Sequence, residues 1–258
     1  LVASSMSIYG EGLYRCAGCG RDVEVERNRE DLDQRRWDPT APCCGGEVVP
    51  LPTNEDKPVR PTSVYAVNKR DQEELCLVVG RAYDIPTLAL RFFNVYGTGQ
   101  AIQNPYTGVA AIFSSRLLAG LPPLVFEDGL QSRDFVHVSD VTAGCAAALT
   151  QPAENQVLNI GSGRPVTVLE VASLLQKELG GPDPEILHTY RAGDVRHCYS
   201  DISRARAQLA WQPRTSLAAE IPALAAWVSS QVPAASAVDQ ASGVDRAMSE
   251  LHQRGLVH

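Results

Sequence analysis

A predicted helix followed directly by a buried strand is the feature that most constrains the fold. Residues 65–83 have the apolar periodicity of a helix, with Thr62 or Ser63 placed to cap it. Pro86 ends this helix, and residues 87–92 form the short, mostly apolar run that is typical of a strand buried in a parallel sheet. The short connection between them favours a doubly wound α/β fold, in which helices cover both faces of a parallel sheet.

Tyr65 and Lys69 lie four residues apart at the start of that helix, so their side chains share one helical face. A free phenol ionises near pH ~10, and a fixed cation beside it stabilises the phenolate. Such a pair can take a proton from a hydroxyl and return it. By itself, the spacing is more typical of a solvated helix face.

The composition is that of an ordinary globular chain suited to a small-molecule substrate. Of its 258 residues, 44% are hydrophobic and 21% are charged, which is enough to bury a sizeable core. The net charge of −7 gives no basic surface for nucleic acid or an anionic membrane, and no apolar run reaches the ~18 residues of a membrane span. Seven cysteines, an odd number, form no obvious disulfide framework, so we expect a reducing cytoplasmic location.

Residues 1–5 have the pattern of an apolar strand that ends in a serine-rich turn. Ligands of open α/β sheets bind beyond the carboxyl ends of the strands, which makes Ser5 and Ser7 candidates for substrate contacts. A plain turn explains these serines equally well.

Four cysteines between residues 13 and 55 predict a ribbon-like insertion that holds a metal. They are Cys16, Cys19, Cys43 and Cys44. The first two form a knuckle that offers two thiolates to one ion, but a second Cys-x-x-Cys is incomplete because Ala41 stands at its first position. Zinc bound by these cysteines and a degenerate insertion without metal therefore both stay open. The polar residues 21–37 are expected to form a surface excursion.

Five motifs occur in the order found in one enzyme family. They are residues 4–10 (SSMSIYG), Tyr65-x-x-x-Lys69, residues 90–97 (LRFFNVYG), residues 133–138 (RDFVHV) and residues 191–194 (RAGD). In these motifs the chain resembles the extended short-chain dehydrogenase/reductases that act on nucleotide sugars, the NAD-dependent epimerase/dehydratase family. The insertion, together with residues 104–108 and 126–129, most resembles the branch that contains dTDP-L-rhamnose 4-epimerase.

The resemblance implies a role for each matched residue. Tyr65 would shuttle the proton of the sugar C4 hydroxyl, Lys69 would stabilise its phenolate and hold the nicotinamide ribose, and Ser5 would orient the substrate. The expected substrate contacts are Ser5, Ser7, Asn94, Phe126, Arg133, Arg191 and Asp194. The expected NAD contacts are Tyr65, Lys69, Ser4 and Phe92. Two arginines from distant segments suit a diphosphate, because each guanidinium makes paired bonds to phosphate oxygens.

Other interpretations of single residues remain open. Phe126 is equally well explained as a core aromatic, and either arginine alone would more often be a surface residue. Asn94 could simply close a turn. We assign structural roles to Asp134 and His137.

The residues next to Ser5 distinguish among the reactions of this family. A 4,6-dehydratase needs an acid and a base beside that serine, and Met6 and Ser7 supply neither. The resemblance therefore favours C4 epimerisation of a nucleotide-diphosphate sugar, expected to be a dTDP deoxyhexose, through a transient 4-keto sugar. The enzymatic alternatives are a 4-ketoreductase and the less suited dehydratase, and the non-enzymatic one is an inactive nucleotide-sugar-binding remnant.

The predicted organisation has three parts. Residues 1–98 form the remainder of a Rossmann-like dinucleotide-binding domain, interrupted at about 13–55. Residues 99–231 form a smaller α/β nucleotide-sugar domain, and residues 232–258 form a linker with a short helix near 244–252. Because the glycine-rich pyrophosphate turn of such domains is not found in the sequence, we expect the chain to be the carboxyl-terminal part of the enzyme. We also expect a homodimer that binds neither nucleic acid nor membrane.

Overall fold

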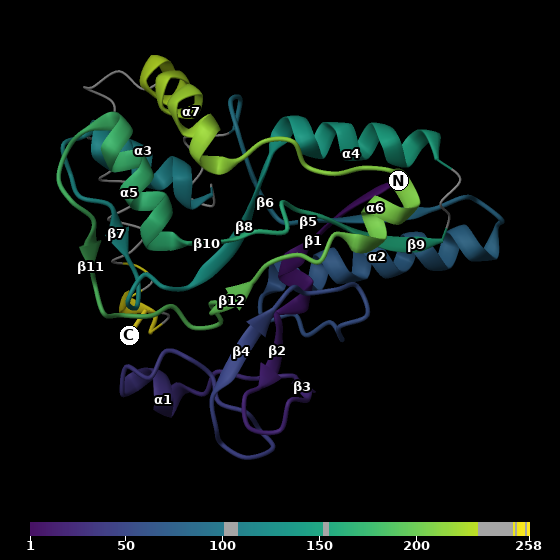
Figure 1. Ribbon diagram of the computed structural model, residues 1–258, viewed down its shortest axis with the longest axis horizontal. Helices are drawn as coiled ribbons and strands as arrows, with labels where there is room; N and C mark the ends of the chain where they lie inside the picture. Colours follow the sequence, from purple (N-terminus) through teal and green to yellow (C-terminus); the bar gives the residue numbers. More distant parts are fainter. Residues whose placement is uncertain (101–107, 152–154, 232–249, 251, 256) are drawn as a thin grey trace.

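A three-stranded parallel sheet in the order β1-β5-β9 forms the centre of one half of the protein (Figure 1). The computed structural model describes residues 1–100, 108–151, 155–231, 250, 252–255 and 257–258. The strands of this sheet are β1 (Val2–Ser5), β5 (Leu88–Phe92) and β9 (Gln156–Ile160). Its helices are α2 (Val64–Ala82) on one face, and α4 (Val138–Thr150) and α6 (Ser203–Leu209) on the other.

The apolar strand sequences are explained by burial on both faces of this sheet. Ala89 packs with Val2 and with Leu77 of α2, whereas its neighbours Leu88 and Leu90 face the core formed with α4 and α6. This arrangement confirms the predicted doubly wound sheet. Both predicted ends of α2 are also confirmed. The Ser63 hydroxyl caps the helix by accepting a hydrogen bond from the Ala66 N–H at 3.1 Å, and the helix stops before Pro86.

The other half of the protein is built around β8, which pairs with β6, β10 and β12. These strands are β6 (Asn94–Tyr96), β8 (Ser132–His137), β10 (Pro165–Thr167) and β12 (His197–Cys198), and β7 (Leu124–Val125) pairs separately with β11 (Glu185–Ile186). The helices α3 (Val109–Leu118), α5 (Val168–Leu179) and α7 (Leu217–Gln231) enclose an apolar core with them. Thr167 caps α5, because its hydroxyl accepts a hydrogen bond from the Glu170 N–H.

Asp134 has the structural role expected of it. Its carboxylate accepts hydrogen bonds from the backbone N–H groups of Ser162, Gly163 and Ser200. This fixes the turn after β9 against β8 and the end of β12.

Residues 13–55, here called the Cys-rich segment, form a small antiparallel sheet in the order β3-β2-β4. Its elements are β2 (Leu13–Cys16), β3 (Asp22–Val23), α1 (Arg29–Asp33) and β4 (Val48–Leu51), and the short helix η1 (Met6–Tyr9) precedes it. The prediction that residues 21–37 form a surface excursion is wrong in one respect. Leu32 and Trp37 are buried against Tyr190, because a polar segment without a core of its own packs onto its neighbour.

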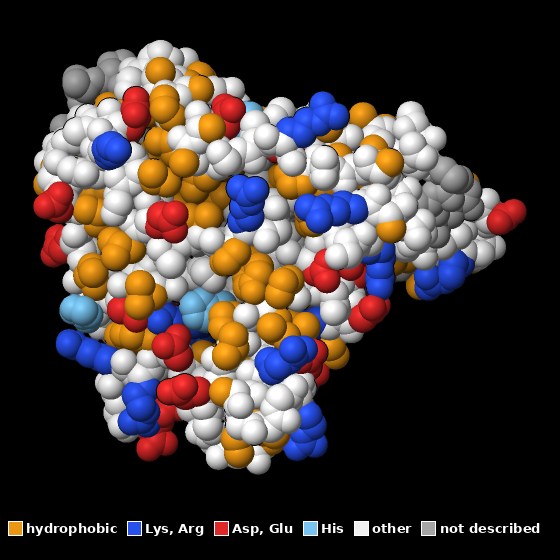
Figure 2. All heavy atoms as spheres, viewed as in Figure 1, with side chains coloured by type: hydrophobic (Ala, Val, Ile, Leu, Met, Phe, Trp, Pro, Cys, Tyr) orange, Lys and Arg blue, Asp and Glu red, His pale blue; other side chains and the backbone are white. Residues whose placement is uncertain are grey.

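Two predicted features lie outside the described residues, namely 104–107 of the matched loop and most of the helix expected near 244–252. Within the described ranges, no helix combines the length and apolarity needed to cross a membrane. On the face shown in Figure 2, Lys and Arg side chains are interspersed with Asp and Glu.

Candidate functional site

The Tyr65 and Lys69 side chains belong to the first turns of α2, where this helix packs against β1 and η1. Lys69 Nζ donates a hydrogen bond to the Ala3 carbonyl oxygen at 2.9 Å and another to Gln72 Oε1 at 3.1 Å. The ammonium is therefore held beside β1. Tyr65 remains 57% exposed, so its phenol is open to a substrate.

Ser5 and Ser7 are brought together at the carboxyl end of β1. The Ser5 hydroxyl caps η1 by accepting a hydrogen bond from the Ser7 N–H, and the two hydroxyls lie 2.9 Å apart. Phe92 pairs with Ser5 across β1 and β5, which places it at the same edge of the sheet. Ser4 has a different environment from the one expected of a cofactor contact. It is 3% exposed and donates its hydroxyl to Glu73 at 2.6 Å, so this hydroxyl faces the interior.

A buried polar network supports that edge of the sheet. The Arg91 guanidinium forms an ion pair with Glu73 at 2.6 Å and donates to the Tyr9 hydroxyl, which in turn donates to Asn159 Oδ1 at 2.7 Å. Burial raises the pKa of Tyr9, so this hydroxyl stays a donor. The sequence signal for this network was Arg91 inside an otherwise apolar strand, because a buried cation requires a partner.

Five of the seven predicted substrate residues line one cavity of about 190 Å³. They are Asn94, Phe126, Arg133, Arg191 and Asp194. The Arg191 guanidinium lies over the Phe126 ring, 4.7 Å from its centroid. Asn94 Oδ1 and Gln131 Oε1 are buried there without a hydrogen-bond donor among the described residues, so each can accept a hydrogen bond from a ligand. Gln131 was missed by sequence reasoning, which offered no motif for it.

Backbone carbonyl groups orient Arg133. Its Nη1 donates to the Ser132 and Arg196 carbonyl oxygens at 2.9 and 3.1 Å, and its Nη2 donates to the Val195 carbonyl oxygen. The Asp194 carboxylate lies 3.7 Å from Nη2. With one anion partner at this distance among the described residues, the guanidinium stays able to bind phosphate oxygens.

A second cavity, of about 650 Å³, lies between α4, α6 and residues 210–215. In the part of the chain that the structure describes, none of the predicted site residues lines it. The smaller cavity is therefore the better candidate.

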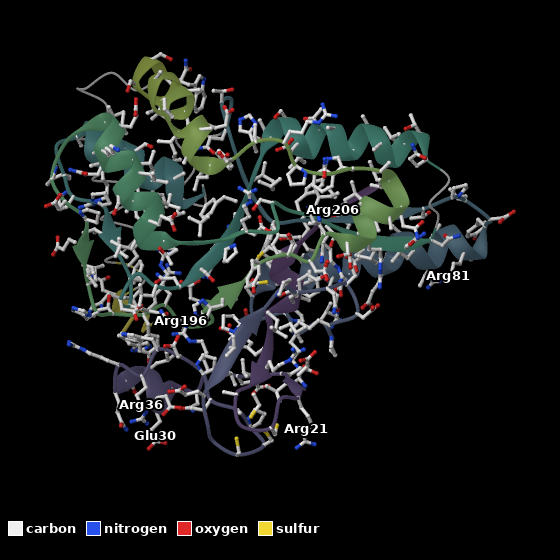
Figure 3. All side chains as sticks on the ribbon, in the orientation of Figure 1. Arg21, Glu30, Arg36, Arg81, Arg196 and Arg206 are labelled. Atoms are coloured by element: carbon white, nitrogen blue, oxygen red, sulfur yellow. The ribbon has the colours of Figure 1, made fainter. Side chains whose placement is uncertain are left out.

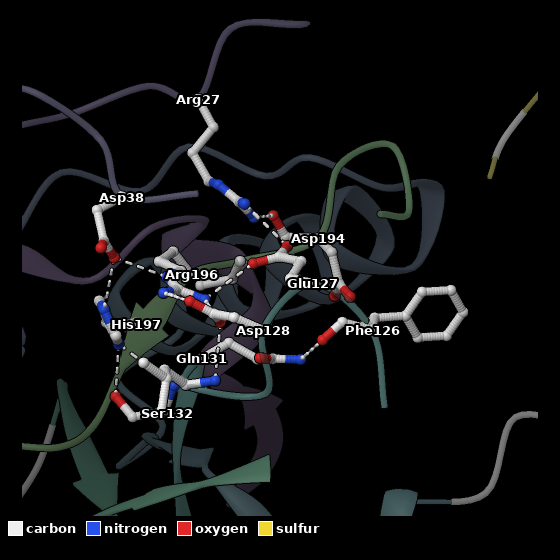
Figure 4. A network of polar contacts seen from close by, with 12 residues as sticks. Arg27, Asp38, Phe126, Glu127, Asp128, Gln131, Ser132, Asp194, Arg196 and His197 are labelled. Atoms are coloured by element: carbon white, nitrogen blue, oxygen red, sulfur yellow. Dashed lines mark hydrogen bonds and ion pairs between the residues drawn. The ribbon is translucent and has the colours of Figure 1, made fainter. Parts of the chain in front are cut away.

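Five charged groups beside the candidate pocket were not predicted from the sequence (Figure 4). Arg196, whose side chain is 1% exposed, pairs with Asp38 and Asp128 at 2.7 Å and with Glu127 at 3.1 Å. Arg27 approaches Glu127 from the other side at 2.8 Å. Burial raises the pKa of Glu127, an effect that Arg27 and then Arg196 oppose. Hydrogen bonds from His197 and Arg196 hold the pKa of Asp38 well below its usual range, although burial opposes them.

The cysteine sulfurs of the Cys-rich segment meet near Arg21 (Figure 3). Cys16 and Cys44 Sγ lie 3.5 Å apart, and Cys19 and Cys43 Sγ lie 3.6 Å apart. The sulfurs of the first, second and third cysteines are all within 4.8 Å of one another. The Cys19 N–H also donates to Cys16 Sγ at 3.4 Å, as expected for a knuckle around an ion.

The thiols of this cluster differ in acidity. Hydrogen bonds from the Arg21 side chain and backbone lower the pKa of Cys19 to about 6. The Cys43 thiol shares hydrogen bonds with the sulfurs of Cys16 and Cys19, which raises its pKa to about 12. Cys19 therefore ionises at a much lower pH than Cys43.

Residues 41–161 match the model of the NAD dependent epimerase/dehydratase family. Over 233 residues the chain is 34% identical to the dTDP-L-rhamnose 4-epimerase of Burkholderia thailandensis, an alignment that covers 90% of this chain and 63% of that protein. The chain belongs to the NAD-dependent epimerase/dehydratase family. The predicted family is thereby confirmed.

Solved structures of similar proteins support the same assignment. The UDP-glucose 4-epimerase of Thermotoga maritima, solved with UDP-glucose, is 34% identical with a TM-score of 0.65, covering 72% of this chain and 59% of that one. The UDP-glucuronic acid 4-epimerase of Bacillus cereus, solved with UDP-glucuronic acid and NAD, is 26% identical with a TM-score of 0.67, covering 89% of this chain and 60% of that one. The chain spans less than two thirds of the length of each of these relatives.

Proposed function

We propose that the protein is a nucleotide-sugar 4-epimerase that acts on a dTDP-linked deoxyhexose. The observation that carries this proposal is the cavity of about 190 Å³ in which Asn94, Phe126, Arg133, Arg191 and Asp194 converge. The motifs of these residues lie far apart in the sequence, yet together they offer two guanidiniums, an amide acceptor and an aromatic face. This donor set suits a diphosphate joined to a base and a sugar.

Tyr65, Lys69 and Ser5 are proposed to perform the proton transfer. The exposed Tyr65 phenolate would accept the proton of the C4 hydroxyl and return it once the sugar has turned in the pocket. Lys69, fixed on the Ala3 carbonyl group, would stabilise the phenolate, and the Ser5 hydroxyl would hold the substrate oxygen.

NAD is the cofactor that we propose for this reaction. The edge of the sheet fits it, because the Lys69 ammonium suits a ribose and Phe92 offers an apolar surface beside Ser5. When bound, NAD would take up and give back the hydrogen at C4. The proposal for NAD is supported by the relatives solved with it.

A direct assay separates this proposal from its alternatives. The full-length protein would be incubated with NAD and dTDP-L-rhamnose, and the sugar followed by NMR for inversion at C4. Consumption of one NADPH per product would identify a 4-ketoreductase instead, and loss of the C6 oxygen from dTDP-glucose would identify a 4,6-dehydratase. Nucleotide-sugar binding without turnover of any of these substrates would favour the inactive remnant and contradict the proposal.

We further propose a structural zinc ion in the cysteine cluster. Four sulfurs at ~2.3 Å from Zn²⁺ in a tetrahedron would be ~3.8 Å apart, close to the 3.5 Å between Cys16 and Cys44 and the 3.6 Å between Cys19 and Cys43. The sulfurs of Cys16, Cys19 and Cys43 lie within 4.8 Å of one another, and Cys44, outside this group, would complete the site from its position next to Cys16. Cys43 would supply the ligand that Ala41 lacks. Metal analysis of protein purified under reducing conditions tests this proposal, because less than about a tenth of an equivalent of zinc contradicts it.

We also propose that the protein forms a homodimer and is located in the cytoplasm. Val67, Leu75 and Val78 of α2 are 38%, 64% and 53% exposed, and such an apolar helix face is commonly covered by another protein surface. Analytical ultracentrifugation of the full-length protein at micromolar concentration tests this state, and a single monomeric species would contradict it.

A further inference from the structure

The Cys-rich segment reaches the candidate pocket through Arg27. One end of this guanidinium pairs with the Glu127 carboxylate at 2.8 Å, and Nη1 donates to the Asp194 carbonyl oxygen at 3.1 Å. The side chains of Arg27 and Glu127 are only 6% and 2% exposed. Phe126, the residue before Glu127, and Asp194 both line the pocket. Both contacts of Arg27 are therefore made to a pocket residue or to its direct neighbour in the chain.

Asp38 provides a second connection. Its carboxylate pairs with Arg196 Nε at 2.7 Å, and the Arg196 side chain is almost completely buried. The carbonyl groups of Val195 and Arg196 are the groups that orient Arg133. A contiguous path of hydrogen bonds and ion pairs therefore joins Asp38 to the guanidinium proposed to bind phosphate.

The buried charges of Glu127 and Arg196 are partly compensated by the Cys-rich segment, through Arg27 and through the largely exposed Asp38. Release of Arg27 or Asp38 removes one of several partners from these charges, which would disturb the backbone at 126–128 and 194–196. The segment has strands of two to four residues and one small buried cluster, shared with Tyr190. A fold of this size usually requires a metal or disulfide to persist.

We propose that the Cys-rich segment is a metal-stabilised brace for the nucleotide pocket. Arg27 and Asp38 act as positioning residues that fix the pocket arginines while the four cysteines hold a metal. This inference rests on the proposed function for the identity of the pocket, but metal binding and pocket geometry are measured separately. Loss of the metal is expected to weaken nucleotide binding at a distance.

The test measures zinc content and binding of TDP by calorimetry in the full-length protein. Arg27→Met is expected to keep about one equivalent of zinc and to bind TDP about tenfold more weakly. Cys19→Ser is expected to lose both zinc and TDP affinity. Arg36→Met, which removes an exposed ion pair with Asp31 in the same segment, and Cys76→Ser, outside the cluster, are the matched controls. Both controls are expected to match the unchanged protein.

A positioning role predicts more than a loss of stability. Arg27→Met should raise KM for the nucleotide sugar about tenfold with kcat within about twofold, and Arg27→Lys should restore part of the affinity. Asp38→Asn removes a charge without changing the side-chain volume, and it should reproduce the effect even if Arg27→Met folds poorly.

Three outcomes would overturn the inference or its premises. Zinc below about a tenth of an equivalent would contradict the proposed metal site, and so would a Cys16–Cys44 disulfide that persists in protein purified with a reducing agent. Unchanged TDP affinity in Arg27→Met, Asp38→Asn and zinc-free Cys19→Ser would contradict the brace. Absence of TDP binding in the unchanged protein would contradict the assignment of the pocket, and with it both the proposed function and the brace, while the zinc measurement would still stand.

Discussion

The proposed proton-transfer pair and the proposed nucleotide pocket are built in different ways. Tyr65 and Lys69 come from consecutive turns of one helix, and their relative position follows from a four-residue spacing. The pocket instead depends on three arginines that contact other segments. Carbonyl groups orient Arg133, and the Phe126 ring lies against Arg191. Buried carboxylates hold Arg196, which lies next to the pocket. Local helical geometry defines the first, and long-range charge pairing defines the second.

This difference predicts different responses to mutation. A side chain of the helical pair can be changed without disturbing the fold, since Tyr65 is largely exposed. A change in the buried charges of the pocket should instead affect folding and binding together, because each ion has more than one partner.

The largest effect is expected for Tyr65→Phe in the full-length protein. Removal of the phenolic hydroxyl should lower kcat for C4 inversion by about 10²- to 10⁴-fold, because the proposed proton carrier is lost. TDP affinity and the thermal unfolding midpoint should stay unchanged. Tyr83→Phe at the end of the same helix is the matched control and should keep full activity. A kcat within tenfold of normal for Tyr65→Phe would show that another residue carries the proton.

Sequence reasoning succeeded where neighbouring residues determine the structure. The start of α2 at Ser63 and the buried strand before Asn94 both follow from short patterns. The pocket residues were predicted from family motifs. The sequence around Arg133 or Arg191 does not itself indicate that the two residues share a cavity.

The sequence could not predict the charged contacts of the Cys-rich segment. Arg27 and Asp38 lie in a polar stretch that looks like any solvated loop, and their partners are Glu127 and Arg196, at least 100 positions away. Only the fold brings these groups together. The same reason explains why Leu32 and Trp37 were expected on the surface, although they are buried against Tyr190.

The second largest effect is expected for Arg196→Met, measured as the free energy of unfolding in urea. This change removes the buried cation that pairs with the Glu127 and Asp128 carboxylates. It should lower the free energy of unfolding by about 3–5 kcal/mol. Arg206→Met on α6 replaces an exposed arginine and should change the free energy of unfolding by less than about 0.5 kcal/mol. Equal stability of the two variants would mean that the buried carboxylates are compensated in some other way.

Arg191→Met should have a smaller effect, confined to binding. The variant keeps an apolar contact with Phe126 but loses the charge-assisted bonds proposed for the diphosphate. A loss of about 1.5–3 kcal/mol in these bonds corresponds to TDP binding roughly 10- to 150-fold weaker by calorimetry. Arg164→Met, an exposed arginine after β9, serves as the control. If Arg191→Met binds TDP normally, the diphosphate lies elsewhere in the cavity.

The smallest effect tests whether the contrast between local and long-range control also holds inside the cysteine cluster. Arg21, two residues away, lowers the pKa of Cys19 to about 6. Hydrogen bonds with the sulfurs of Cys16 and Cys19, more than 20 positions away, contribute to raising the pKa of Cys43 to about 12. In reduced, metal-free protein, alkylation of Cys19 by iodoacetamide should therefore rise about tenfold between pH 5 and 7, as the thiolate forms. Cys43 should stay unreactive over this range, and peptide mass spectrometry reads both sites. Arg21→Gln should move the Cys19 midpoint upward without changing Cys43. Equal alkylation of the two cysteines at pH 7 would show that the cluster shares its protons as a unit, so that local control by Arg21 does not operate there.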